Sequence, residues 1–147
     1  MKKGCCLLLL ILLGGLIALV FLVGKPHMTV ATTPVSYSAL EEYDKKDVPP
    51  FAQNIYRACY AHWQVGEWAW RCDVPPDCEE LLRQWLAEKG GTPRDVSMFC
   101  CPDDMPPPEW WNMPPDARLV SNRDLEFTRM SMWYSPTANR VWIFYEQ

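Results

Sequence analysis

The chain has 147 residues, a net charge of −4 at pH 7, 49% hydrophobic residues, fourteen prolines and seven cysteines. This length fits one domain of ordinary size and excludes a large multidomain enzyme. The composition also excludes collagen, a coiled coil and a wholly disordered chain, because it has neither their repeats nor their low hydrophobicity.

An uncharged run of 21 residues, Gly4–Gly24, lies close to the N-terminus. As a helix with a rise of about 1.5 Å per residue it spans roughly 31 Å, which matches a bilayer's hydrocarbon core of about 30 Å. We therefore expect residues 1–25 to form an uncleaved signal-anchor that contacts the lipid bilayer through residues 4–24. A cleaved signal peptide is the alternative, but its apolar core is normally about 7 to 15 residues, shorter than Leu7–Val23.

Two lysines before this run set its expected orientation. Lys2 and Lys3 favour the cytoplasmic side of the membrane under the positive-inside rule. The sequence therefore predicts a single-pass protein of the cytoplasmic (inner) membrane, with its N-terminus inside. The domain, residues 39–147, is then periplasmic or extracellular, and the threonine- and serine-rich residues 26–38 are expected to form a flexible tether.

Two helices are expected at the start of the domain. Ser38, followed three residues later by Glu41, has the pattern of a capping box and favours a short helix over Ala39–Lys46. The Pro49–Pro50 pair suits the first turn of a second helix. This second helix is expected to continue to about Trp63, because apolar residues recur at helical spacing, at Phe51, Ile55 and Cys59.

A strand and a third helix are expected next. Gly66–Cys72 alternates tryptophan or cysteine with polar residues, as a half-buried strand does. Asp77 and Glu80 have the pattern of a capping box, and Lys89 and Gly90 suit the last turn and the C-cap of a helix. The apolar face of this helix comprises Cys78, Leu81, Leu82, Trp85 and Leu86.

The last third of the chain is expected to be a loop followed by strands. Pro102–Pro115 holds six prolines in fourteen residues, which favours an irregular or polyproline-like segment at the surface or wrapped round the domain. Aromatic and β-branched residues in Glu126–Tyr134 and Arg140–Tyr145 predict a β-hairpin with a five-residue turn. Leu119 and Val120 indicate a third short strand.

These elements predict a single transmembrane helix followed by a small α+β domain. Two or three helices are expected to pack on a small antiparallel sheet that ends in a C-terminal β-hairpin. Disulfides are expected to support this domain. The reason is that it has eight tryptophans but only six leucines and two isoleucines, and a core of large aromatic side chains tolerates imperfect packing less well than an aliphatic one.

Five cysteines lie in the predicted outer part of the chain, namely Cys59, Cys72, Cys78, Cys100 and Cys101. In an oxidising compartment such cysteines are usually bonded, so all five are disulfide candidates. The preferred set pairs Cys72 with Cys78, and Cys59 with Cys100 or Cys101. One cysteine is then left free or joins two chains.

Cys59 and His62 also raise two alternatives to a disulfide. With Cys72 and Cys78 they supply four residues of the types that bind zinc, but structural zinc sites prefer two tight pairs, which this spacing does not provide. On a helix, one turn would bring Cys59 and His62 together as a nucleophile and its base. Nothing completes a triad, and no hydrolase, zinc-protease, phosphate-loop or dinucleotide motif is present. We therefore predict no catalytic residue, metal, cofactor or nucleotide partner.

Charge and aromatic residues narrow the class of partner. From Pro26 onward, eleven lysines and arginines against eighteen aspartates and glutamates give a net charge of −7, and no basic patch for nucleic acid is visible. Trp110 and Trp111, held between prolines, are the ligand-contact candidates, because exposed aromatic side chains mark recognition surfaces. The alternative is that both tryptophans form a lid over the aromatic core.

The sequence thus predicts a non-enzymatic, membrane-tethered extracytoplasmic module for binding or assembly, with a protein or a cell-wall glycan as its partner. An accessory subunit of a cell-envelope membrane complex is the first alternative, and a small secreted thiol-dependent enzyme is the second. The three differ in what makes the contacts: the domain, the membrane helix, or Cys59 with His62.

Overall fold

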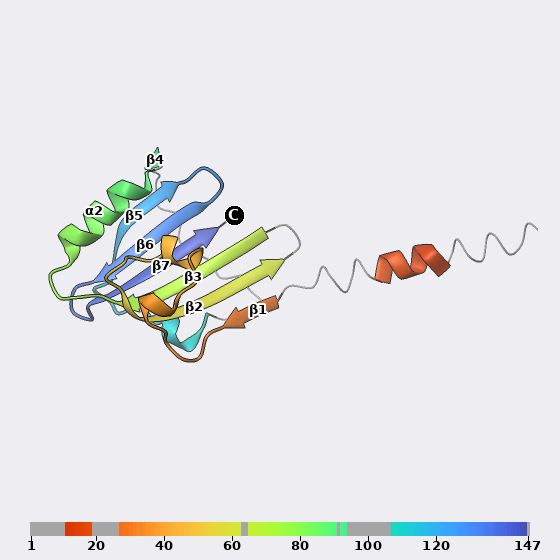
Figure 1. The fold of residues 1–147 in the computed structure, drawn as a ribbon, viewed down its shortest axis with the longest axis horizontal. Helices are drawn as coiled ribbons and strands as arrows, with labels where there is room; N and C mark the ends of the chain where they lie inside the picture. The colour runs from red at the N-terminus through yellow and green to blue at the C-terminus, as the bar shows by residue number, and fades with distance from the viewer. Residues whose placement is uncertain (1–10, 19–26, 63–64, 91, 94–106, 147) are drawn as a thin grey trace, which may run out of the picture.

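The structure, a computed structural model, describes residues 11–18, 27–62, 65–90, 92–93 and 107–146. Its strands are β1 His27–Val30, β2 Gln53–His62, β3 Val65–Asp73, β4 Thr92–Pro93, β5 Arg118–Asp124, β6 Arg129–Ser135 and β7 Arg140–Glu146. They form one antiparallel sheet in the order β1-β2-β3-β7-β6-β5-β4 (Figure 1). Beside the sheet lie one α-helix, α2 Glu79–Lys89, and three 3-10 helices, η1 Tyr37–Ala39, η2 Asp44–Lys46 and η3 Glu109–Trp111.

Both faces of the sheet are buried. The first, called the helix face below, is covered by α2 and by the segment 37–52 that includes η1 and η2 (Figure 1). Its buried strand residues include Ile55, Trp70, Cys72, Met130, Met132, Val141 and Ile143. The second, called the η3 face, is covered by η3, where Trp111 packs on Trp142 and Phe144. Because both faces are covered, β7 carries a continuous apolar run, Val141–Tyr145, without the alternation of a half-solvated strand.

The C-terminal hairpin is where the sequence pattern and the structure agree best. β6 and β7 pair in register with Trp133 opposite Trp142, which confirms the predicted hairpin. Asn139 closes the turn with φ 48°, a left-handed conformation that asparagine tolerates. The third strand expected at Leu119 and Val120 is β5.

The helix predicted after the Pro75–Pro76 pair is α2, but its N-terminus differs from the prediction. Cys78 is the N-cap and makes no side-chain capping bond, while Asp77 precedes it with φ 56°. Leu82, Trp85 and Leu86 are buried as expected, whereas Leu81 is 46% exposed. Gly90 ends the helix with φ 68°, a conformation that favours glycine.

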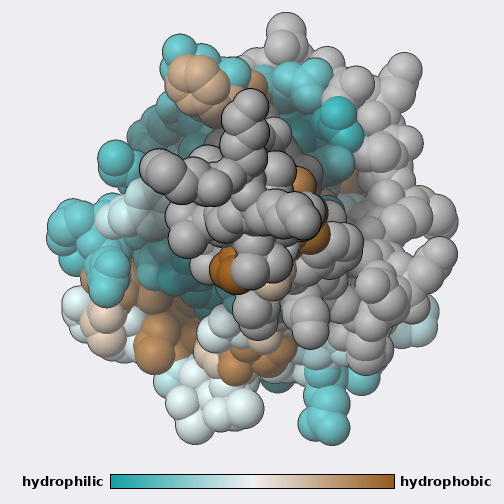
Figure 2. Space-filling model, turned by 90° about the vertical axis from the view of Figure 1, so that its right-hand side faces the viewer, coloured by the Kyte–Doolittle hydropathy of each residue, from teal (hydrophilic) through white to brown (hydrophobic). Residues whose placement is uncertain are grey.

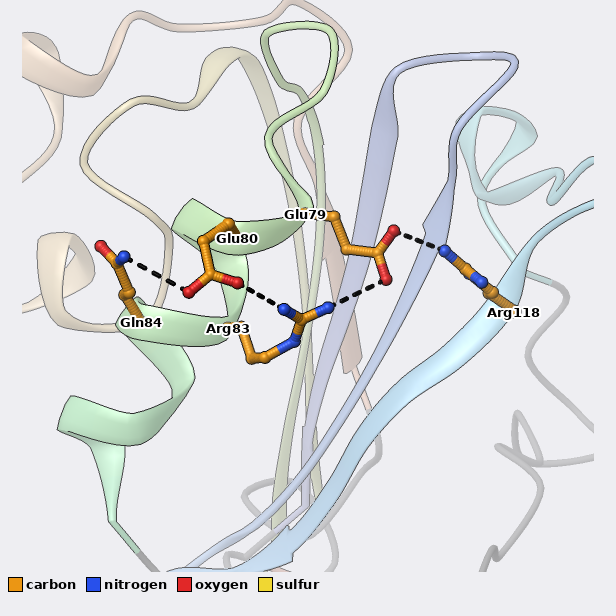
Figure 3. Close-up of polar contacts among 5 residues, drawn as sticks. All are labelled: Glu79, Glu80, Arg83, Gln84 and Arg118. Atoms are coloured by element: carbon orange, nitrogen blue, oxygen red, sulfur yellow. Dashed lines mark hydrogen bonds and ion pairs between the residues drawn. The ribbon is translucent and has the colours of Figure 1, made fainter.

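Ion pairs join the first turn of α2 to β5. Figure 3 shows Glu79 between two arginines, with its Oε2 2.6 Å from Arg118 Nη2 and its Oε1 3.3 Å from Arg83 Nη2. Glu80 pairs with Arg83 on the same side of the helix. All four side chains are largely exposed, so each pair contributes at most about 1 kcal/mol, and the buried face of α2 provides most of its attachment.

The predicted fold class, with two or three helices on a small sheet, is wrong. The segment expected to be a helix from Pro49 to Trp63 is mostly strand β2, and the helix expected over Ala39–Lys46 is replaced by η1 and η2. The segment expected to be a tether contains β1, which pairs with β2. The spacing of four residues misled because residues four apart share a face in a strand as well as in a helix.

The predicted membrane anchor and the inner-membrane, single-pass localisation also need correction. Within the described ranges, no helix is long and apolar enough to span a bilayer. The described helical residues at this end are 11–18, eight residues that cover about 12 Å against a hydrocarbon core of about 30 Å. Residues 4–10 and 19–24 of the predicted span lie outside the described residues.

Candidate functional site

A groove of about 610 Å³ opens on the η3 face, beside the point where β1 leaves the sheet. It is lined by Val30, Ala31, Thr32, Tyr56, Glu109 and Trp110. These residues come from three stretches that are far apart in the chain: the end of β1, the start of β2 and η3. The groove thus combines two aromatic rings, one carboxylate and the backbone of an edge strand.

The register of β2 with β3 places Tyr56 in this groove. From Tyr56 to His62 the two strands pair without interruption, with Tyr56 opposite Arg71 and Ala58 opposite Ala69. Alternate side chains of a strand share a face, so Tyr56 lies with Ala58 on the η3 face, and Ile55 points into the helix-face core. A β-bulge precedes this stretch, between Gln53 and Tyr56, where β2 has one residue more than β3.

Arg71 holds the Tyr56 ring in place. Its guanidinium carbon lies 4.4 Å from the ring centroid, a cation–π contact. Burial, and then the neighbouring Arg140, lower the pKa of Arg71. The Asp73 carboxylate lies 4.0 Å from Arg71 and acts in the opposite direction, raising the pKa of Arg71. Asp73 also accepts hydrogen bonds of 2.8 Å from Arg140 and from Asn54.

The two tryptophans singled out from the sequence have different positions. Trp111 is only 7% exposed and packs in the core of the η3 face, as the lid alternative expects. Trp110 is half-buried, lines the groove and lies 5.8 Å from Tyr56, centroid to centroid. A hydrogen bond of 2.8 Å from the Trp111 N–H to the Pro108 carbonyl closes the turn that contains both tryptophans. Trp110 is therefore the better placed of the two to touch a ligand.

A second group of ionisable residues lies at the C-terminal end of α2, on the helix face. Burial raises the pKa of the Asp47 carboxyl to about 6, although the Lys89 ammonium acts against this rise. Lys89 Nζ lies 4.9 Å from the Trp85 ring and 5.9 Å from the Tyr145 ring, and burial lowers its pKa. The Tyr145 hydroxyl donates to the Asp47 carbonyl at 3.1 Å. These contacts tie the segment 37–52 to β7.

A partly buried ion pair lies on the same face. Asp44 is 6% exposed, and its Oδ2 lies 2.9 Å from Arg57 Nη1. The Arg57 guanidinium also covers the Trp70 ring at 5.1 Å. Burial raises the pKa of Asp44, and Arg57 opposes that rise. The pair anchors η2 to β2.

The expected disulfides are corrected by the structure. Cys59, Cys72 and Cys78 are free thiols, so the predicted bond between Cys72 and Cys78 is absent, and Cys59 has no bonded partner among the described residues. Cys72 and Cys78 are buried in the helix-face core, where reduced cysteines pack as small apolar side chains. The other candidates, Cys100 and Cys101, lie outside the described residues.

Cys59 and His62 lie together on strand β2. The helical turn that was expected to bring thiol and imidazole together therefore does not exist. Burial raises the pKa of the Cys59 thiol, which is opposite to the shift that activates a nucleophile. Among the described residues, no three His, Cys, Asp or Glu side chains are grouped so as to hold a metal ion.

Sequence reasoning missed Tyr56 and Glu109 as groove residues. Glu109 precedes Trp110 in the chain, so it could have been predicted as a groove residue together with Trp110. Tyr56 was hidden by the helix expected over its segment. Comparisons of the chain with protein-family models, curated proteins and solved structures give no match, so the function has to be inferred from the groove and the residues around it.

Proposed function

We propose that this protein is a non-enzymatic binding module that takes an extended polypeptide in the groove on its η3 face. The observation that carries the proposal is the groove itself, with Tyr56 and Trp110 as apolar walls and Glu109 as its charged group. Concave, mostly apolar sites with a few polar groups are the usual form of a binding site.

The orientation of the rings favours an inserted side chain over a stacked sugar. The Trp110 ring is tilted by 32° from the Tyr56 ring and by 68° from the Trp111 ring. Trp110 Nε1 is buried and has no acceptor among the described residues. The rings therefore do not form the flat exposed platform on which a sugar stacks, whereas tilted rings suit an aliphatic or aromatic side chain inserted between them.

Charge favours a basic ligand. Glu109 is exposed at the groove, and the chain from Pro26 onward carries a net charge of −7. An acidic surface steers basic segments toward it and repels nucleic acids and acidic polymers. The expected ligand is therefore a polypeptide segment with a large apolar residue next to lysine or arginine.

The chemistry of the described thiols supports binding over catalysis. Burial raises the pKa of Cys59, Cys72 and Cys78, which keeps these thiols protonated and weakly nucleophilic. The groove has one carboxylate, Glu109, and no described thiol in its lining. Its residues are suited to recognition by shape and charge.

Selection of twelve-residue peptides from a phage-displayed library on the purified full chain tests this function. We expect the enriched peptides to share a large apolar residue beside a lysine or arginine. Affinities of synthetic copies, measured by titration calorimetry, should fall at least tenfold for Trp110→Ala. Phe127→Ala is the matched control, because Phe127 is 75% exposed on the β5–β6 turn and lies outside the groove.

Two results would overturn the proposal. One is equal enrichment and affinity on the Trp110→Ala variant when its unfolding midpoint shows that it is folded. The other is binding of a hexasaccharide of N-acetylglucosamine in a Trp110-dependent way while no peptide is enriched, which would make the groove a glycan site.

A further inference from the structure

We propose that the peptide binds by adding a strand to the free edge of β1, with its backbone paired to Met28 and Val30. This inference rests on the proposed function and goes further, because it specifies which atoms hold the ligand. β1 is the outermost strand at its end of the sheet, and no described strand pairs with its other side.

The register of β1 shows which of its backbone groups face outward. Antiparallel pairs alternate between residues that exchange hydrogen bonds and residues that do not. The Ala31 N–H donates to the Arg57 carbonyl at 2.8 Å, and the same register continues with Thr29 opposite Cys59. The N–H and C=O groups of Met28 and Val30 therefore point away from β2, toward the position of an added strand.

Along its described residues, His27–Val30, this edge has no charged side chain of Asp, Glu, Lys or Arg and no proline. Natural edge strands are protected by charged side chains, prolines or very short length. No Asp, Glu, Lys or Arg lies between His27 and Ser38, and Val30 and Val35 are 37% and 40% exposed. The opposite edge is protected, because β4 has only two residues, one of them Pro93.

The groove lies on the side of β1 where an added strand would place its side chains. Val30 pairs with Ala58 and shares the η3 face with Tyr56, while Met28 packs against the η3-face core. A strand added about 4.8 Å from β1 places alternate side chains on this same face. Figure 2, which views the molecule from the right-hand side of Figure 1, shows hydrophobic residues along the lower part of this side.

Charge and spacing together define the partner. Main-chain hydrogen bonds from β1 supply affinity for any extended segment, and the groove supplies selectivity at every second residue. Glu109 favours a lysine or arginine close to the inserted side chain. The partner is therefore an extended peptide with apolar residues at alternate positions and at least one basic residue.

Proline substitution on β1 tests the outward hydrogen bond. Val30→Pro removes an N–H that β2 does not use, so the sheet is expected to remain intact. Affinity for the library-selected peptides should fall about tenfold, the effect of losing one well-formed hydrogen bond. Phe127→Ala is the control, because Phe127 lies outside both the groove and β1, and it should bind as the parent chain does.

N-methylation of the peptide tests the same point without altering the protein. Each N-methyl group removes one backbone donor, so a scan along the peptide should weaken binding about tenfold at every second residue and little at the residues between. Amide exchange of Met28 and Val30 should slow when peptide binds. A scan without this two-residue period would overturn strand addition.

The outcomes separate this inference from the proposed function. If no peptide is enriched, the proposed function itself fails. If peptides bind, depend on Trp110 and tolerate both Val30→Pro and N-methylation, only strand addition fails. If sedimentation shows a dimer that Val30→Pro converts to monomer, the edge pairs with a second copy of this chain and the peptide proposal is overturned.

Discussion

The guanidinium of Arg71 lies over the Tyr56 ring, 4.4 Å from its centroid, although fourteen residues separate the two in the chain. The contact follows from the register of β2 with β3, in which Tyr56 pairs directly with Arg71. It makes Arg71 a positioning residue for the groove.

Replacing Arg71 with methionine should weaken peptide binding severalfold and leave the fold intact. The variant loses a cation–π contact of about 0.5 to 2 kcal/mol but also removes the cost of burying the charge, so the free energy of unfolding should change by about 1 kcal/mol or less. Titration calorimetry and urea unfolding measure the two effects. Arg71→Lys, which keeps a cation over the ring, should restore most of the affinity; equal binding by Arg71→Met would refute the positioning role.

Trp111 should contribute to the stability of the fold and not to peptide binding. Because it is 7% exposed and packs on Trp142, Trp111→Ala should lower the free energy of unfolding by about 3 to 5 kcal/mol. Phe127→Ala, at a position 75% exposed, should change it by about 0.5 kcal/mol or less. Urea unfolding followed by far-UV circular dichroism compares the two, and a small effect of Trp111→Ala would contradict the packing of η3 on the sheet.

Stability should fall as pH rises through the range in which Asp47 ionises. Burial raises the folded-state pKa of this carboxyl from 3.8 to about 6, so folding favours its protonated form. The stabilisation is complete below about pH 4 and is lost as pH rises to about 6. At roughly 1.4 kcal/mol per unit, discounted for the partial exposure of Asp47, the loss is about 1 to 2 kcal/mol.

Unfolding of Asp47→Asn over pH 4 to 8 isolates this contribution. Relative to the parent chain, the variant should be more stable at pH 8 than at pH 4 by that amount. Tyr145→Phe is the control, because it removes the hydrogen bond to the Asp47 carbonyl and keeps the carboxyl, so its pH dependence should match that of the parent chain. An unchanged pH profile for Asp47→Asn would show that this group does not couple to folding.

Removing Arg57 should cost more stability than removing an exposed arginine. Arg57→Met leaves Asp44, 6% exposed, as an unpaired buried carboxylate, and should lower the free energy of unfolding by about 1 to 3 kcal/mol at pH 8. The loss should become smaller as pH falls, because the pKa of Asp44, already raised by burial, rises further without Arg57, so a larger fraction of the carboxyl is protonated. Arg83→Met, which breaks only exposed pairs, should cost less than about 1 kcal/mol throughout.

The described thiols should react in order of their exposure. In a variant with serine at cysteines 5, 6, 100 and 101, iodoacetamide should modify the half-buried Cys59 first and reach Cys72 and Cys78 only as the protein unfolds. Intact-mass spectrometry counts the modified thiols over time. If this variant, denatured without a reductant, accepts only one label, Cys72 and Cys78 are bonded to each other and the structure is wrong on this point.

Some elements could be predicted because their signals are local. The aromatic residues on both sides of the 135–139 turn specify the β6–β7 hairpin, whose strands are neighbours in the chain. Leu82, Trp85 and Leu86 specify α2 because residues three or four apart on a helix share a face. The acidic charge and the proline-rich stretch are likewise properties of the sequence alone.

The sheet and the groove depend on pairings that no local pattern contains. β3 pairs with β7, so residues about 75 positions apart become neighbours, and the bulge in β2 is defined only by the strand opposite it. The spacing of Phe51, Ile55 and Cys59 fits a helix, but pairing with β1 and β3 makes this segment a strand. The sequence determined which short segments form regular structure. Only the tertiary structure decided which of them meet, because hydrogen bonds between strands and burial on two faces are gained only when distant segments pair.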